Sequence, residues 1–216
     1  MRGITIDNMH TGDDWGLILN AKQIDPPTPK IYTVAVDGRD GEIDLSEALT
    51  GTIQYENRNA SFTFIASEGT YQDREDLLME IMGTVHGKRL KIFTDDDPDH
   101  YLIGRWQVKD ISNNAGYATF TITASCDPWR YAVNVTKYAF NVRGVQIYAY
   151  VQNNGFKRQI PLLTVQGSIT IKKDTISHTL TDGSYKLMDL PLEHGINIWT
   201  LEGTGTLTIE FTEGVL

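Results

Sequence analysis

The sequence predicts a mainly β protein of two domains: an N-terminal β-sandwich or split-barrel-like domain with one helix, then a smaller β-sandwich. Most of its 216 residues fall into short segments rich in β-branched and aromatic residues, each bounded by Gly, Pro, Asn or Asp. One segment, residues 71–86, has helical spacing instead. Pro128 then interrupts the β pattern, and the segments after it are almost purely β. We therefore expect domains at residues 1–130 and 131–216.

Strands of the first domain are predicted from alternation and from the turns between them. Phe62 and Phe64 alternate with Ser61 and Thr63, as in a half-buried strand. Residues 113–116 are expected to form a hairpin loop. The predicted strands are residues 15–19, 31–36, 59–65, 88–93, 101–111 and 117–125.

The acidic run at residues 95–99 has two interpretations. Asp favours turn starts and Pro98 fixes φ, so the run is expected to form a hairpin turn. The alternative is a calcium site, since carboxylates are calcium ligands. The run lacks the glycine and the distal glutamate of an EF-hand loop, which favours the turn.

The helix is predicted from its periodicity and its ends. Thr70 is a suitable N-cap, acidic residues crowd the first turn, and Gly83 or Gly87 can end the helix. We expect the helix to cover one face of a sheet. Its apolar residues are Leu77, Leu78, Ile81, Met82 and Val85.

The second domain is predicted to consist of short strands separated by glycine-containing turns at residues 153–155, 181–183 and 203–205. The strands are expected at residues 136–141, 145–151, 159–165, 168–171, 196–201 and 206–211. Its aromatic side chains are expected in the core rather than on a sugar-binding platform. They are Tyr138, Tyr148, Tyr150, Tyr185 and Trp199.

The net charge of −9 is confined to the first domain, which has 12 basic and 21 acidic residues, against seven of each in the second. This acidity either keeps the protein soluble, or repels a polyanion or attracts a basic partner. It disfavours specific nucleic-acid binding. No apolar run is long enough for membrane insertion.

No motif of a known reaction occurs in the sequence. It has no His-Glu-x-x-His pair, nucleophile elbow, phosphate loop or dinucleotide signature. Cys126, the single cysteine, has no histidine near it in sequence. We therefore expect no catalytic residue, no cofactor and no metal site.

Residues 36–45, Val-Asp-Gly-Arg-Asp-Gly-Glu-Ile-Asp-Leu, resemble the Pro-Gly-Arg-Asp-Gly turn and following strand of siphophage distal tail (Dit) proteins, with Asp37 in place of the proline. Further similarities follow in the order of that family over essentially the whole chain. They lie at residues 54–58, 62–64, 77–91, 95–98, 101, 104–105, 127–129, 153–155, 160–161 and 195–197.

The resemblance implies a structural virion protein rather than an enzyme. Such a protein would form a homo-hexameric ring at the distal end of the phage tail and would be made in the bacterial host cytoplasm. The ring would join the tail tube protein to the tail-tip apparatus, a tail-associated lysin or a fibre protein, and would leave a lumen for DNA. The second domain would be galectin-like and would dock adhesion components such as receptor-binding proteins. The alternative function is a carbohydrate-binding module in host cell-wall recognition.

Within the resembling turn, Asp37, Arg39 and Asp40 are the candidate site residues. Gly38 and Gly41 can take positive φ, which a tight turn needs. Arg39 can tie the turn internally or form an ion pair with a neighbouring subunit. If acidic surface lines the lumen, it would repel DNA from the wall.

Overall fold

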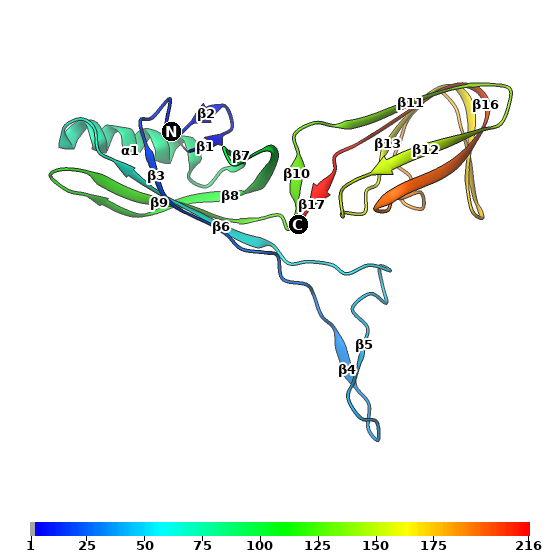
Figure 1. Cartoon of the computed structure of the whole chain (residues 1–216), viewed down its shortest axis with the longest axis horizontal. Helices are drawn as coiled ribbons and strands as arrows, with labels where there is room; N and C mark the ends of the chain where they lie inside the picture. Colours follow the sequence, from blue (N-terminus) through cyan, green and yellow to red (C-terminus); the bar gives the residue numbers. More distant parts are fainter. Residues whose placement is uncertain (1–2) are drawn as a thin grey trace. The chain divides into compact units, whose positions relative to one another are not determined.

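The structure is a computed structural model that describes residues 3–216. Antiparallel sheets and a helix make up the chain, which confirms the predicted mainly β fold class. It folds as two compact units (Figure 1). The first holds the described residues up to Arg130 together with Leu216, and the second holds residues 131–215. Each unit has its own hydrophobic core.

The main sheet of the first unit has the strand order β2–β1–β7–β8–β9–β6–β3. Short strands β10 (Arg130–Ala132) and β17 (Gly214–Val215) pair with each other. The sheet strands are β1 (Ile4–Ile6), β2 (Met9–His10), β3 (Ile18–Ile24), β6 (Arg58–Ala66), β7 (Arg89–Thr94), β8 (Asp97–Asn113) and β9 (Ala118–Cys126).

Helix α1 (Tyr71–Val85) lies where the periodicity predicts it. Thr70 is its N-cap and forms a reciprocal capping box with Asp73, which satisfies two backbone N–H groups at the helix start. Leu78, Ile81 and Val85 are buried in the core of the first unit. The helix ends before Gly87, whose φ of 77° leaves the helical region, and not at Gly83.

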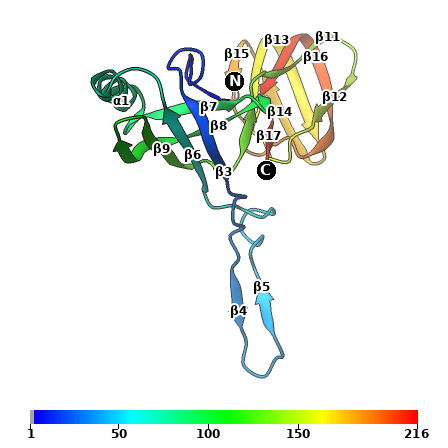
Figure 2. The ribbon, with the colours of Figure 1, turned by 60° about the vertical axis from the view of Figure 1, so that its left-hand side comes forward.

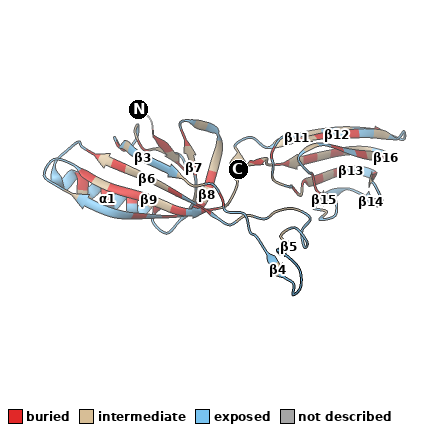
Figure 3. Cartoon of the chain, turned by 60° about the horizontal axis from the view of Figure 1, so that its bottom comes forward, coloured by how far each residue is buried: buried red, intermediate tan, exposed pale blue. Residues whose placement is uncertain are grey.

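The sheet of the first unit buries one face and exposes polar side chains on the other. Along β6 buried and less buried residues alternate, as predicted (Figure 3). Phe62 and Phe64 are fully buried. Trp106 on β8 packs against Phe62, with ring centroids 5.9 Å apart. This alternation places apolar residues against the core and leaves threonine, serine and glutamine on the opposite face.

Two predicted boundaries in the first unit are wrong. The strand expected at residues 15–19 begins only at Ile18 and continues to Ile24, because Gly16, at a φ of 63°, ends a turn that contains Trp15. In the acidic run, residues 95 and 96 alone form the turn, and Pro98 lies within β8. Thr94 pairs directly with Asp97, so the hairpin is tighter than the sequence suggested.

A separate two-stranded sheet lies between β3 and β6 in the sequence. Strands β4 (Thr33–Ala35) and β5 (Glu42–Asp44) pair with each other and with no other strand of the described chain. Figure 2 shows this hairpin projecting away from the ends of β3 and β6. The strand predicted at residues 31–36 is therefore present, but shorter.

The second unit is built on two long strands, β13 and β16, which pair along most of their length. Strands β11 and β12 each pair with a different half of β16. Strands β14 and β15 pair with β13. The bounds are β11 (Thr136–Arg143), β12 (Ile147–Asn153), β13 (Leu162–Lys173), β14 (Ile176–Leu180), β15 (Gly183–Tyr185) and β16 (Gly195–Phe211).

Residues 203–205 do not form the predicted turn, because β16 runs through them, and β13 likewise joins two strands that were predicted separately. Gly203 and Gly205 have φ of 112° and 152°, so they bend the strand without ending it. A Cβ on Gly205 would lie 2.1 Å from the carbonyl oxygen of Gln166, and Gly167 faces Gly205 across the ladder. These glycines are therefore needed because β13 and β16 approach each other closely here, and not because the chain turns.

The expectation that the aromatic residues of the second unit lie in its core holds only in part. Trp199 is fully buried, and Tyr138 and Tyr185 pack at the edge of the core. Tyr148 and Tyr150 are 59% and 58% exposed, which corrects the prediction for both. On β12 the inward positions are taken by Ile147, Ala149 and Val151, so the period of two directs both tyrosines outward.

Candidate functional site

Residues 26–57, here called the arm, are the most exposed part of the first unit. The arm carries the β4–β5 hairpin, which Figure 3 draws in the colour of exposed residues. Several apolar side chains of the arm are exposed. Leu49 is 99% exposed, Ile31 69% and Tyr32 64%. A lone two-stranded hairpin is marginally stable in water, and exposed apolar residues of this kind mark interaction surfaces.

The base of the arm is anchored to the first unit. Its two chain segments pair through the Lys30 N–H, which donates to the Gln54 carbonyl, and the Glu56 N–H, which donates to the Thr28 carbonyl, both at 2.8 Å. Tyr55 packs edge-on against Trp129, with ring centroids 5.4 Å apart. The arm is thus held to the first unit at its base, where Tyr55 contacts Trp129, while its hairpin extends away.

Asp37, Arg39 and Asp40 lie together at the tip of the arm, on the turn between β4 and β5. Gly38 and Gly41 have the expected positive φ, 81° and 74°. The Arg39 N–H donates to the carbonyl of Val36 at 3.2 Å. Among residues 3–216 the Arg39 side chain forms no ion pair, so the structure brings these residues onto one turn without joining their side chains.

The strand leaving the turn is ordered by local hydrogen bonds. Asp44 accepts from the N–H and the hydroxyl of Ser46, and the Ser46 oxygen in turn accepts from the N–H of Tyr32. These hydrogen bonds lower the pKa of the Asp44 carboxyl below its usual value. Asp44 therefore stays charged and adds to the acidity of the arm.

The arm is strongly acidic. Residues 26–57 include two basic residues, Lys30 and Arg39, and six acidic residues. The acids are Asp37, Asp40, Glu42, Asp44, Glu47 and Glu56. An exposed segment that is both acidic and apolar fits a partner surface with basic and apolar residues.

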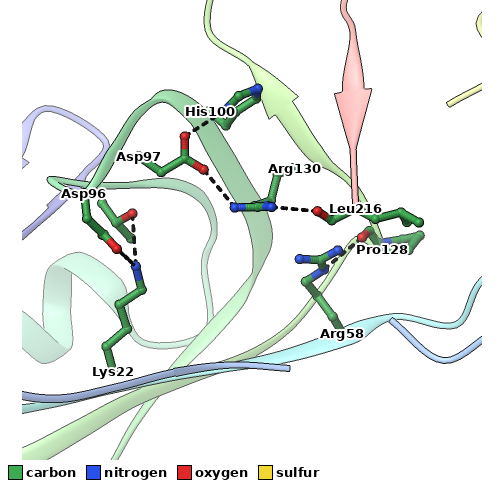
Figure 4. A network of polar contacts seen from close by, with 9 residues as sticks. Lys22, Arg58, Asp96, Asp97, His100, Pro128, Arg130 and Leu216 are labelled. Atoms are coloured by element: carbon green, nitrogen blue, oxygen red, sulfur yellow. Dashed lines mark hydrogen bonds and ion pairs between the residues drawn. The ribbon is translucent and has the colours of Figure 1, made fainter. Parts of the chain in front are cut away.

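The acidic run at residues 95–99 is occupied by structural contacts (Figure 4). Asp96 forms an ion pair with Lys22 at 2.6 Å, and the hydrogen bond from Lys22 lowers the pKa of the Asp96 carboxyl. Asp97 accepts hydrogen bonds from His100 and Arg130, and Arg130 also donates to the Leu216 carbonyl. The run thus fixes a hairpin and the last residue of the first unit.

Two buried arginines of the first unit have roles that no sequence motif indicates. Arg58 is 3% exposed and donates to the Pro128 carbonyl, and burial lowers the pKa of its guanidinium, with a smaller contribution from Arg130 (Figure 4). Arg74 on α1 is 2% exposed and reaches the carbonyl groups of Gly69 and of the loop between β8 and β9. Each arginine binds at least one backbone carbonyl that is 40 or more residues away in sequence, a role that leaves no local signal.

The remaining candidate for chemistry is Cys126, which is fully buried. Burial, aided by Asp127, raises the pKa of its thiol to about 12, so it stays protonated at neutral pH. Among residues 3–216, no group of three or more His, Cys, Asp or Glu side chains is placed to hold a metal ion. Within the same residues, no helix has the length and apolarity to cross a membrane.

The exposed face of the main sheet carries an open hollow of about 510 Å³. Arg105, Lys109 and Asp25 contribute charge to it, and Ser61 and Thr123 contribute hydroxyls. The hollow lacks the enclosed apolar lining that small-molecule sites usually have. It is an open surface with mostly polar residues.

The comparison with solved structures finds the crystal structure of the SPP1 Dit (gp 19.1) protein, described as a paradigm of the hub adsorption apparatus in phages infecting Gram-positive bacteria. That structure matches this chain with a TM-score of 0.71 at 14% sequence identity, over 100% of both chains. No family model and no curated protein matches the sequence. The similarity to distal tail proteins predicted from the turn motifs is thereby confirmed at the level of the fold: this chain has the fold of the SPP1 Dit protein.

Proposed function

We propose that this chain is a distal tail hub: a structural virion protein that forms a homo-hexameric ring between the tail tube and the tail-tip adhesion apparatus of a siphophage. The observation that carries the proposal is the fold match to SPP1 Dit, which extends over the whole of both chains. A match of that extent includes both units. It therefore favours a function like that of the whole SPP1 Dit protein over a likeness limited to one domain that unrelated proteins could share.

The arm supports a role in assembly. Its exposed apolar side chains and its acidic residues need a partner surface, and a neighbouring copy supplies one at equal stoichiometry. In this proposal residues 1–130 form the ring and its lumen for DNA. Asp37, Arg39 and Asp40 contact the next subunit.

The second unit, residues 131–216 in the proposed domain division, would be a galectin-like module that docks adhesion components. The proposed partners are the tail tube protein, a tail-associated lysin or fibre protein, and receptor-binding proteins. The hub would act without catalysis in the virion, after synthesis in the bacterial host cytoplasm.

The test is the mass of the purified protein, measured by light scattering after size exclusion over a range of concentrations. A ring predicts six times the chain mass of 24.3 kDa, or twice that for two stacked rings. A variant with the arm replaced by a short turn should keep both units folded and lose the assembly. A wild-type protein that remains monomeric at every concentration would contradict the ring.

A second candidate function is carbohydrate binding by the second unit. It is favoured by the exposure of Tyr148 and Tyr150 on one face of β12, since exposed aromatic rings stack on sugars. A pull-down with purified bacterial cell-wall polysaccharide tests it. Binding that is lost in the Tyr148→Thr, Tyr150→Thr double variant would support this function, and no retention of the wild type would refute it.

A further inference from the structure

We propose that Arg58 and Arg130 form a binding site for one small oxyanion, such as phosphate, at the base of the arm. The site lies within the first unit: Arg58 is the first residue of β6, and Arg130 lies just after the end of β9. The proposal goes beyond the tail hub function and does not depend on ring formation.

The first step is the burial of the Arg58 guanidinium. The residues of β6 in phase with Arg58, which include Ala60, Phe62 and Phe64, belong to the hydrophobic core, so Arg58 takes a core-facing position at the end of the strand. Only 3% of Arg58 is exposed. Burying a charged group is costly unless an opposite charge and hydrogen bonds compensate for it. This position therefore requires an anionic partner.

The second step is that no negative charge of the described chain pairs with Arg58. Its guanidinium donates to the Pro128 carbonyl, which is neutral, and it forms no ion pair within residues 3–216. Cys126 lies opposite Arg58 on β9, but burial raises the pKa of its thiol to about 12, so the thiol is neutral. Asp127 already pairs with Arg89 at 2.9 Å.

The third step is a second guanidinium beside the first. Figure 4 shows Arg58 and Arg130 next to Leu216, and repulsion by Arg130 adds to the effect of burial in lowering the pKa of Arg58. Arg130 donates from Nη1 to Asp97 at 2.9 Å and from Nη2 to the Leu216 carbonyl at 2.6 Å. Its Nε and the Nη2 of Arg58 are buried and have no hydrogen-bond partner within residues 3–216. Each of two mutually repelling cations thus keeps an unused donor.

The fourth step is the chemistry of the ligand. A water molecule can accept hydrogen bonds from both donors, but it leaves the buried charge uncompensated. An oxyanion accepts the same hydrogen bonds and supplies the negative charge, and guanidinium groups are well suited to phosphate and carboxylate oxygens. The side chain of Arg130 is 36% exposed, so a small anion reaches the site from the side of this residue.

The bound anion would act as a structural link at the base of the arm. Arg58 directly follows the arm, and two contacts already join this part of the chain to the segment after β9: Tyr55 packs against Trp129, and Arg58 donates to Pro128. An anion held by Arg58 and Arg130 would add a third. Because the unfolded chain does not hold the two arginines together, the anion would stabilise the folded first unit.

The experiment measures binding and stability on the full chain. Titration calorimetry with inorganic phosphate, and separately with acetate, gives stoichiometry and dissociation constant at an ionic strength held constant with sodium chloride. Urea denaturation, followed by the NMR signal of the buried Trp106 indole N–H, gives the stability of the first unit. We expect one phosphate per chain. At about ten times its dissociation constant, phosphate should raise the folding equilibrium constant of this unit about elevenfold.

Lysine substitutions test the two donors, because lysine keeps the charge but lacks the guanidinium fork. Arg58→Lys and Arg130→Lys should each weaken phosphate binding about tenfold or more. Arg130→Lys keeps a cation beside Asp97 at a partly exposed site, so it keeps the test decisive if Arg58→Lys does not fold. Arg105→Lys is the matched control and should bind phosphate as the wild type does. Arg105 is an exposed arginine that lines the polar hollow on the main sheet.

The outcomes decide between the site and its alternatives. No phosphate response in the wild type would overturn the proposal and assign the two donors to water. Equal stabilisation of the wild type and of all three lysine variants would be a general salt effect, which also overturns it. Binding lost only in Arg105→Lys would place the phosphate in the hollow and overturn the arginine pair. Acetate binding at one per chain, lost in Arg58→Lys and Arg130→Lys, would support the site with a carboxylate as its ligand.

Discussion

The hydroxyl of Tyr138 on β11 binds both backbone groups of Gln152 on β12, accepting from its N–H at 3.1 Å and donating to its carbonyl at 3.2 Å. One side chain thereby occupies the end of an otherwise open strand edge. The backbone N–H and carbonyl groups of Tyr150 and Tyr148 point to the same side of β12 as those of Gln152. Among the described residues, no strand pairs with β12 on that side. The free edge is therefore limited at one end by Tyr138.

Tyr138→Phe should destabilise the second unit by about 1 kcal/mol, because it removes two hydrogen bonds to partly buried backbone groups and little volume. The measurement is urea denaturation followed by an NMR signal of that unit, such as the indole N–H of the buried Trp199, because the other three tryptophans lie in the first unit. Tyr150→Phe is the control, since its ring is exposed. Equal free energies of unfolding for both variants would contradict a structural role for the Tyr138 hydroxyl.

Arg74→Met should cost the first unit about 3 kcal/mol of stability. The guanidinium is buried and donates to the carbonyls of Gly69, Asn114 and Ala115 and to the side chain of Asn113. Methionine fills similar space but leaves these acceptors unpaired. Chemical denaturation of the full chain measures the effect on the transition of this unit. Gln72→Met, an exposed site on the same helix, should change it little, and a similar loss at both positions would refute the argument.

Gly205→Ala should destabilise the second unit by at least about 2 kcal/mol. An added Cβ would meet the Gln166 carbonyl oxygen at 2.1 Å, and the φ of 152° is unfavourable for any side chain. The expected result is a clear fall in the melting temperature of that unit. Gly116→Ala has open space around the new Cβ and an ordinary φ, so it should leave the stability nearly unchanged.

The capping carboxylate of Asp73 makes a pH-dependent contribution to the stability of the first unit. Hydrogen bonds from the Thr70 backbone and side chain lower its pKa below the ordinary value of 3.8. A lowered folded-state pKa means that the carboxylate stabilises the fold above the unfolded pKa, and that this stability is lost as pH falls through the folded pKa. Wild type and Asp73→Asn should therefore differ in stability at neutral pH.

The difference between wild type and Asp73→Asn should shrink below pH 3.8 and vanish in stronger acid, as followed by denaturation at stepped pH. Asp40→Asn, on the arm and outside any helix, is the control. A constant difference at all pH values would mean that the amide loses packing rather than charge.

Local signals decided which parts of this fold could be predicted. The helix was found because its cap, its periodicity and its glycine end all lie within 18 residues of the sequence, from Thr70 to Gly87. The continuity of β13 and β16 was missed because Gly203 and Gly205 look like a turn until the strand that crosses them is known. A glycine required by a close tertiary approach has the same sequence signal as a glycine required by a turn.

The candidate site followed the same pattern. Residues 36–45 could be placed on a turn, and the structure places them at the tip of the arm. The exposure of the arm could not be predicted, because a strand pattern at residues 31–36 does not say what covers it. The exposure of Tyr148 and Tyr150 was missed since β12 is apolar on both faces, and only the core shows that the smaller residues face inward. Arg58 and Arg74 find carbonyl partners far away in sequence, which no local pattern encodes.

Arg39→Ala should weaken the proposed ring without weakening the fold. The Arg39 side chain is exposed at the arm tip and forms no ion pair among the described residues, so its removal costs the isolated chain nothing measurable. If it contacts the next subunit, its loss should raise the concentration at which the assembly dissociates by about tenfold, equivalent to about 1.4 kcal/mol. Light scattering on dilution measures this, with Lys30→Ala at the arm base as the charge-matched control. If the ring dissociates at the same concentration in wild type and Arg39→Ala, Arg39 does not contribute to the interface between subunits. An electrostatic role of this turn in the interface would then be refuted as well.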